Sequence, residues 1–111
     1  PESGNLSVRT EALARLVKAS ASEYGGSIEN GEVSDVMAYH ESHAFLEVAR
    51  VLAEGLQKEA ASEKAATRIL DALKGADEAF GDISKPEVKA NDPAILLAVA
   101  ARVELIASSV R

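Results

Sequence analysis

The sequence predicts an all-α protein: an antiparallel helical bundle or hairpin with one long central helix and an apolar C-terminal helix. Three observations lead to this prediction. Alanine is abundant while Pro and aromatic residues are scarce. No run of alternating β-branched residues suggests a strand, so we expect no β-sheet. Glycines separate segments of helical periodicity. We expect residues 1–111 to form one helical domain, with 1–9 as a loose lead-in.

The first helix is predicted over about residues 10–24. Thr10 is a suitable N-cap residue, and apolar residues at helical spacing follow from Leu13 onward. Gly25 and Gly26 are expected to end this helix. Asn30-Gly31 then predicts a turn before the next element.

A continuous helix is predicted from Ser34 to Leu73, about 40 residues, because Gly55 is the one interior breaker and strong helix formers surround it. The alternative is a break near Gly55–Ser62, with Ser62 capping a new helix, which would give a more compact molecule. Propensity favours the continuous helix. Further along, residues 84–87 are expected to form a loop or a helical turn.

The last helix is predicted over about residues 93–110, with Asp92 as N-cap and Pro93 at the first position. Its apolar residues occur on several sides, and one antiparallel bundle covers only part of such a helix. We therefore expect a homo-oligomer, most simply a dimer, or a helical protein partner. The predicted interaction residues are Ile95, Leu97, Val99, Val103, Leu105 and Ile106.

Both histidines of the chain lie in the stretch 38–48. On a helix, His40, His43 and Glu47 share one face, a spacing that can bind zinc, iron or manganese. Di-iron bundles take a Glu-x-x-His pair from each of two helices, and this chain has no such pair. The simpler interpretation places His40 at the edge of a buried stripe and His43 in solvent. That stripe would comprise Val33, Met37, Ala44, Val48 and Val51. We expect no cofactor and no catalytic site, and we expect folding not to require a metal.

Charge and composition exclude several function classes. The net charge is −6 and no basic cluster is present, which argues against nucleic acid as a partner. Cysteine is absent, so there is no disulfide and no thiolate metal site. We expect no membrane span and no signal peptide. The expected location is therefore the cytoplasm, or outside the cell by export without a cleavable signal peptide.

The opening segment Asn5–Leu13 (NLSVRTEAL) resembles the start of the small secretion-associated proteins of the type VII (ESX) system, the EspC-like group. Those proteins continue as a helical hairpin and end in a tyrosine-based export signal with an acidic residue. Residues 75–80 resemble that end, with Asp77 and Glu78 in the acidic positions, although Leu73 stands in place of the tyrosine. This resemblance implies an exported helical hairpin.

A second segment, residues 71–81 (DALKGADEAFG), is similar to the His-x-Leu-Lys-Gly segment of histidine phosphotransfer domains, which are four-helix bundles. Leu73, Lys74 and Gly75 match, but Asp71 replaces the phosphorylated histidine. The resemblance implies a docking surface without the imidazole chemistry. The same three residues are also a common way to end a helix.

These observations favour a non-enzymatic helical interaction protein, namely a secretion-associated substrate, chaperone or adaptor that acts through apolar helix faces. One alternative is a degenerate signalling bundle of the histidine phosphotransfer type. The other is a metal-binding helical bundle that uses His40, His43 and Glu47.

Overall fold

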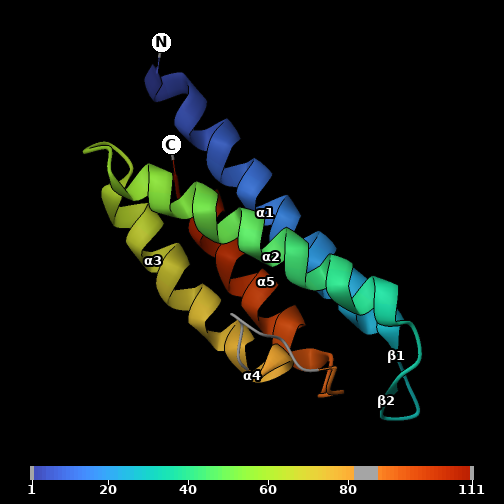
Figure 1. Cartoon of the computed structure of the whole chain (residues 1–111). Helices are drawn as coiled ribbons and strands as arrows, with labels where there is room; N and C mark the ends of the chain where they lie inside the picture. Colours follow the sequence, from blue (N-terminus) through green and yellow to red (C-terminus); the bar gives the residue numbers. More distant parts are fainter. Residues whose placement is uncertain (1, 82–87, 111) are drawn as a thin grey trace.

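The computed structural model of the chain describes the backbone of residues 2–81 and 88–110, and the side chains of 6–81 and 88–110. Four helices dominate it (Figure 1). They are α1 (Glu2–Ser27), α2 (Val36–Gln57), α3 (Glu63–Leu73) and α5 (Ala94–Ser108). The 3-10 turn η1 (Lys74–Ala76) and the short helix α4 (Asp77–Phe80) extend α3.

The helices form an antiparallel bundle around a shared core. α1 packs against α2 and α5, and α3 packs against the same two helices. Successive helices run in opposite directions, so both chain termini lie at one end of the bundle (Figure 1). The molecule measures 47 × 23 × 18 Å. The predicted all-α antiparallel helical bundle is therefore confirmed.

The first helix is longer than the sequence predicts, at both ends. It begins at Glu2, so the expected loose lead-in over residues 2–9 is wrong for its backbone. Thr10 is not an N-cap but an interior helical residue, fully buried, whose Oγ1 lies 3.0 Å from the carbonyl oxygens of both Leu6 and Ser7. At the other end, helix α1 continues through both glycines to Ser27, whose buried hydroxyl donates to the Tyr24 carbonyl. Packing against α2 and α5 outweighs the low helix propensity of Gly.

A small β-hairpin joins α1 to α2. Strand β1 (Ile28–Glu29) pairs with β2 (Glu32–Val33) in an antiparallel register. Asn30 and Gly31, at the predicted turn, have positive φ angles of 53° and 78°, as a two-residue turn of this kind requires. Within residues 2–81 and 88–110, the expectation of no sheet is wrong at this hairpin alone.

The predicted continuous helix from Ser34 to Leu73 is wrong, because the chain reverses between Gln57 and Glu63. Ser62 lies at the turn, and its buried Oγ donates to the Leu56 carbonyl at 2.6 Å. The reversal folds α3 back against α2 and buries its apolar face. That face comprises Ala66, Ile69, Ala72 and Leu73. Helix propensities differ by tenths of a kcal/mol, whereas each large buried apolar side chain contributes about 1.5–3 kcal/mol, so burial decides the break.

The buried stripe of α2 lies on a different face from the predicted one. Met37, Val48 and Val51 are exposed, and so is Ala44, while Val33 lies partly buried in β2. The residues that face the core are Tyr39, Ser42, Leu46, Ala49, Ala53 and Leu56. Four of these are small or polar, so a hydrophobicity pattern underrates this face. Small side chains suit it because they let α1 approach closely.

The close approach of α1 and α2 is fixed by a reciprocal pair of serines. Ser20 Oγ donates to the Ser42 carbonyl at 2.7 Å, and Ser42 Oγ lies 2.8 Å from the Ser20 carbonyl. Both side chains are buried. The hydroxyls are thus satisfied without water, which removes most of the cost of burying them.

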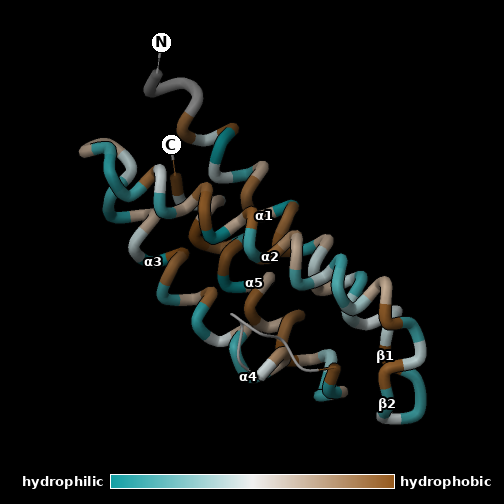
Figure 2. The backbone as a smooth tube through the Cα atoms, viewed as in Figure 1, coloured by the Kyte–Doolittle hydropathy of each residue, from teal (hydrophilic) through white to brown (hydrophobic). Residues whose placement is uncertain are grey.

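The last helix begins close to its predicted position. The Asp92 carboxylate accepts a hydrogen bond from the Ala94 backbone N–H at 2.9 Å, as a capping residue does. In Figure 2, hydrophobic colouring recurs along α5. The expected loop or turn at residues 84–87 lies outside the described residues.

Candidate functional site

The outward side of α2 carries an exposed apolar surface. Met37, Val48, Val51 and Leu52 have 74%, 49%, 62% and 45% of their surface exposed. Their spacing places them on the side of the helix that faces away from the core residues. We call these four residues the α2 face. Contiguous exposed apolar surface of this kind commonly marks a site of protein interaction.

Carboxylates accompany the α2 face along its length. Glu41 is exposed one turn after Met37, and Glu47 and Glu54 line a groove beside it. The nearby cation, Arg50, forms an ion pair with Glu47, and its Nη2 lies 3.9 Å from Asp77 Oδ1. Because this ion pair also cancels the charge of Glu47, it is Glu41 and Glu54 that make the border of the α2 face net negative.

The groove beside the α2 face separates α2 from α3 and α4, and its volume is about 750 Å³. Its charged lining residues are Glu47, Arg50, Glu54, Asp71, Lys74 and Asp77. Charges of both signs are mixed in it, so it has the character of a solvated surface rather than of a concentrated ligand set. In the described part of the chain, no three His, Cys, Asp or Glu side chains are grouped so that they could hold a metal ion.

The two histidines contact aromatic rings at one end of the bundle. The His43 ring lies 5.2 Å from the Phe80 ring and the His40 ring lies 5.6 Å from the Tyr39 ring, both in edge-on geometry. Glu47 is engaged with Arg50. The structure therefore does not unite His40, His43 and Glu47 as a metal site. His40 is exposed and His43 is partly buried, so the expectation that His43 lies in solvent is wrong.

A second apolar surface lies on the outward side of α5. Leu97 and Leu105 are 58% and 70% exposed, and Ala94, Ala98 and Ala101 are exposed beside them. We call these five residues the α5 face. Because α5 lies diagonally across the bundle from α2, the two faces point in opposite directions (Figure 1).

The structure divides the six predicted interaction residues into two groups. Val99, Val103 and Ile106 are at most 6% exposed and belong to the core of this chain. Leu97 and Leu105 are open to solvent, and Ile95 is partly buried. Only the second group is accessible to a partner, and that partner remains a prediction.

Sequence reasoning missed the α2 face because it assigned three of its four residues, Met37, Val48 and Val51, to the core. Helix α2 is apolar on two sides, and periodicity alone does not say which side is inside. Tyr39 and Ser42 could have indicated the buried side. A large aromatic ring and a small hydroxyl suit a close contact between helices better than the flexible Met37 side chain does.

No helix within residues 2–81 and 88–110 combines the length and the apolarity needed to cross a bilayer. This finding agrees with the expectation from sequence for the described residues.

Comparison with known families gives a match over almost the whole chain. Residues 1–110 match the family described as the iron permease-associated 4-helix bundle domain. No curated protein sequence matches the chain. No solved structure matches it either.

The family match corrects both resemblances drawn from short segments. The chain is neither an EspC-like secretion substrate nor a histidine phosphotransfer domain, because one different family accounts for nearly its whole length. Gly75, central to the second resemblance, has a packing role: a Cβ there would lie 3.2 Å from Val99 Cγ2 on α5.

The family match also overturns the functions that were inferred from these two resemblances. The secretion-associated substrate, chaperone or adaptor and the phosphotransfer-like bundle are wrong. The metal-binding alternative is only partly consistent with the iron-related family description, because the described residues do not gather His40, His43 and Glu47 into a metal site. The description instead points to a role related to iron transport. Since the match covers residues 1–110 of 111, the chain belongs to the iron permease-associated 4-helix bundle domain family.

Proposed function

We propose that this domain binds an iron permease through the α2 face and supports iron transport without catalysing a reaction. The observation that carries the proposal is the α2 face itself: four large apolar side chains that the described part of the chain leaves 45–74% exposed. The family description supplies the kind of partner. The transport pathway belongs to the permease, and this domain contributes a binding surface.

The chemistry of the α2 face indicates what the permease presents to it. An apolar stripe on a helix is commonly covered by the apolar stripe of another helix. The negative border formed by Glu41 and Glu54 favours Lys or Arg beside the partner's stripe. The net charge of −6 acts in the same direction. We therefore infer an amphipathic permease segment with basic edges, and binding that weakens as salt is raised.

Binding to this partner would place the domain beside a membrane. We also propose that residues 1–111 act as one folding unit, because buried residues of α1, α2, α3 and α5 share one core.

The test is co-purification of the domain with an iron permease from the same organism, in detergent. Val48→Glu and Val51→Glu, made separately, place a carboxylate in the middle of the α2 face, and each should weaken binding at least tenfold. Ser22→Glu, at an exposed site on α1, adds the same charge elsewhere and should bind as the unaltered domain does. Circular dichroism verifies that all three variants fold.

Iron uptake by cells that carry the permease is the second measurement. Val48→Glu should lower uptake and Ser22→Glu should not. Unchanged co-purification of both α2 variants would show that the α2 face does not bind the permease.

A further inference from the structure

Five exposed residues form a stripe along α5 that is symmetric about its middle member, Ala101; exposed Ala98 and Glu104 flank this stripe and are not alike. Leu97 and Leu105 lie four residues before and after it, and Ala94 and Ser108 lie seven residues before and after it. At about 100° per residue, all of these positions fall within about 40° of one line along the helix. Ala94, Leu97, Ala101, Leu105 and Ser108 are all exposed. This stripe has the same order of side-chain sizes from either end of the helix. The central residue and the two outer residues are small, and the two residues between them are leucines.

We propose that α5 binds the α5 of a second copy of this chain, antiparallel, about a two-fold axis that passes beside Ala101. In this arrangement Leu97 of one copy lies level with Leu105 of the other, and the two Ala101 side chains meet at the axis. Small residues at the crossing allow helix axes to approach to about 8 Å. A two-fold contact suits a self-complementary stripe because the same residues serve both copies.

The charges beside the α5 face select the antiparallel direction. Arg68 lines a groove between α3 and α5 together with Leu105, and the other charged residues of this groove are Arg102 and Asp71, which leave it net positive. Glu78 lies near the other end of α5, since its carbonyl accepts a hydrogen bond from Asn91 Nδ2 at 2.7 Å, just before the helix starts. The α3 edge of this surface is thus basic beside Leu105 and acidic beside the start of α5.

The positions of Arg68 and Glu78 along the axis of α5 can be counted from Gly75, which packs beside Val99. Arg68 is seven residues before Gly75 and Glu78 is three residues after it, so they lie on opposite sides of the two-fold axis. The axis brings Arg68 of one copy toward Glu78 of the other. Exposed Lys64 adds a positive charge at the Arg68 end, and exposed Asp92 adds a negative charge at the Glu78 end. In a parallel pair the α3 edges of the two copies would lie on opposite sides of the contact, so these opposite charges would not meet.

This inference concerns a different surface from the permease proposal, and either can fail alone. The 15 residues of α5 span about 22 Å, so the contact belongs to the small, weak class of interfaces. Association should therefore depend on concentration in the micromolar range, about the affinity such interfaces give.

Sedimentation analysis across that range is the first measurement, with monomer and dimer masses as the possible outcomes. Leu105→Glu should weaken the dimer at least tenfold, whereas Val48→Glu on the α2 face should leave it unchanged. Arg68→Glu alone and Glu78→Arg alone should each weaken it several-fold, and the double variant should regain most of the loss. A monomer at every concentration overturns the proposal, and failure of the double variant to recover overturns the antiparallel arrangement.

Disulfide trapping locates the axis, because the chain has no cysteine of its own. Ala101→Cys should give a covalent dimer under mild oxidation, since residues at the axis meet the short Cα separation a disulfide requires. Ala44→Cys, an exposed alanine on the outward side of α2, is the matched control and should stay monomeric. Equal trapping at both positions would mean random collision and would overturn the proposal.

Discussion

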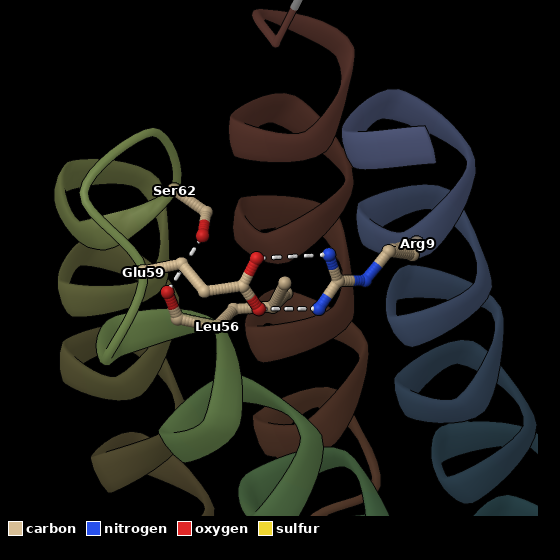
Figure 3. A network of polar contacts seen from close by, with 4 residues as sticks. All are labelled: Arg9, Leu56, Glu59 and Ser62. Atoms are coloured by element: carbon tan, nitrogen blue, oxygen red, sulfur yellow. Dashed lines mark hydrogen bonds and ion pairs between the residues drawn. The ribbon is translucent and has the colours of Figure 1, made fainter. Parts of the chain in front are cut away.

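The two ends of the bundle are held together by opposite means. At the hairpin end, Tyr24, Tyr39 and Phe80 are fully buried, and their ring centroids lie 5.3–5.8 Å apart. At the α2–α3 end, Arg9 on α1 forms a two-point ion pair with Glu59 in the turn after α2, with N–O distances of 3.2 and 2.7 Å (Figure 3). The first cluster is dry, and the second is about half open to water.

We infer that the buried aromatic cluster determines the fold, whereas the exposed ion pair only supports it. Aromatic rings contribute area burial and edge-on contacts that water does not weaken. An exposed ion pair contributes little because water and salt screen it. The hairpin end should therefore dominate stability, and the other end should tolerate change. Four substitutions test this contrast.

Phe80→Ala should have the largest effect, because it removes a ring that contacts Tyr24, Tyr39 and His43. We expect a loss of about 3–5 kcal/mol in the free energy of unfolding, measured by urea denaturation. Met37→Ala, at a 74% exposed site, is the control and should change stability by less than about 0.5 kcal/mol. Similar effects of the two substitutions would mean that the aromatic cluster does not anchor the bundle.

Tyr24→Phe keeps the ring and removes only the hydroxyl. That hydroxyl donates to the Ala79 carbonyl at 2.8 Å and accepts from the Asn91 N–H at 3.0 Å, tying α1 to α4 and to the start of α5. The substitution leaves the Ala79 carbonyl and the Asn91 N–H without this partner, which should lower the free energy of unfolding by about 1–3 kcal/mol. A stability equal to that of the unaltered chain in the same urea titration would refute this role.

The same hydroxyl predicts a pH dependence at the hairpin end. Burial raises the pKa of Tyr24 above its usual value, with the nearby Tyr39 adding to the rise and the Asn91 N–H opposing it. A raised pKa means that stability is fully present below the unfolded pKa of about 10 and is lost as pH rises through the folded value. Tyr24→Phe should therefore remove part of the destabilisation seen above about pH 10.

Ser62→Ala tests the turn at the opposite end. Its hydroxyl donates to the Leu56 carbonyl at 2.6 Å and is buried (Figure 3). Because one buried acceptor loses its donor, we expect a loss of about 1–2 kcal/mol in the free energy of unfolding, less than for Phe80→Ala. Ser109→Ala, at an exposed hydroxyl, provides the comparison. Should Ser62→Ala unfold the chain, the turn rather than the aromatic cluster would set the fold.

Arg9→Gln should have the smallest effect on stability, and this effect should depend on pH. The hydrogen bonds and charge of Arg9 lower the pKa of Glu59. A lowered pKa means that the contribution is present above the unfolded value and is lost as pH falls through the folded one. Thermal melts should therefore differ slightly between Arg9→Gln and the unaltered chain at neutral pH and converge in acid. A difference that persists in acid would assign the effect to packing of the Arg9 side chain instead.

The candidate surfaces were only partly predictable. Leu97 and Leu105 were expected to contact a partner, and their exposure is compatible with that. Val99, Val103 and Ile106 were expected there too, yet they fill the core, because α1 and α3 together cover more of α5 than a single neighbouring helix would. The α2 face could not be found from periodicity, since both sides of α2 have helical repeats of apolar residues.

The sequence by itself determined the helical class, the turn at Asn30-Gly31 and the Asp92 cap, because composition, left-handed backbone preference and local hydrogen bonding act over a few residues. Tertiary structure alone decided where the long segment breaks, how far α1 extends and which side of α2 is buried. Each of those choices sets propensities of tenths of a kcal/mol against the burial of several apolar side chains at about 1.5–3 kcal/mol each. Burial depends on which helices become neighbours. That information lies in the contacts of α1 with α2 and α5, and no local window of the sequence contains it.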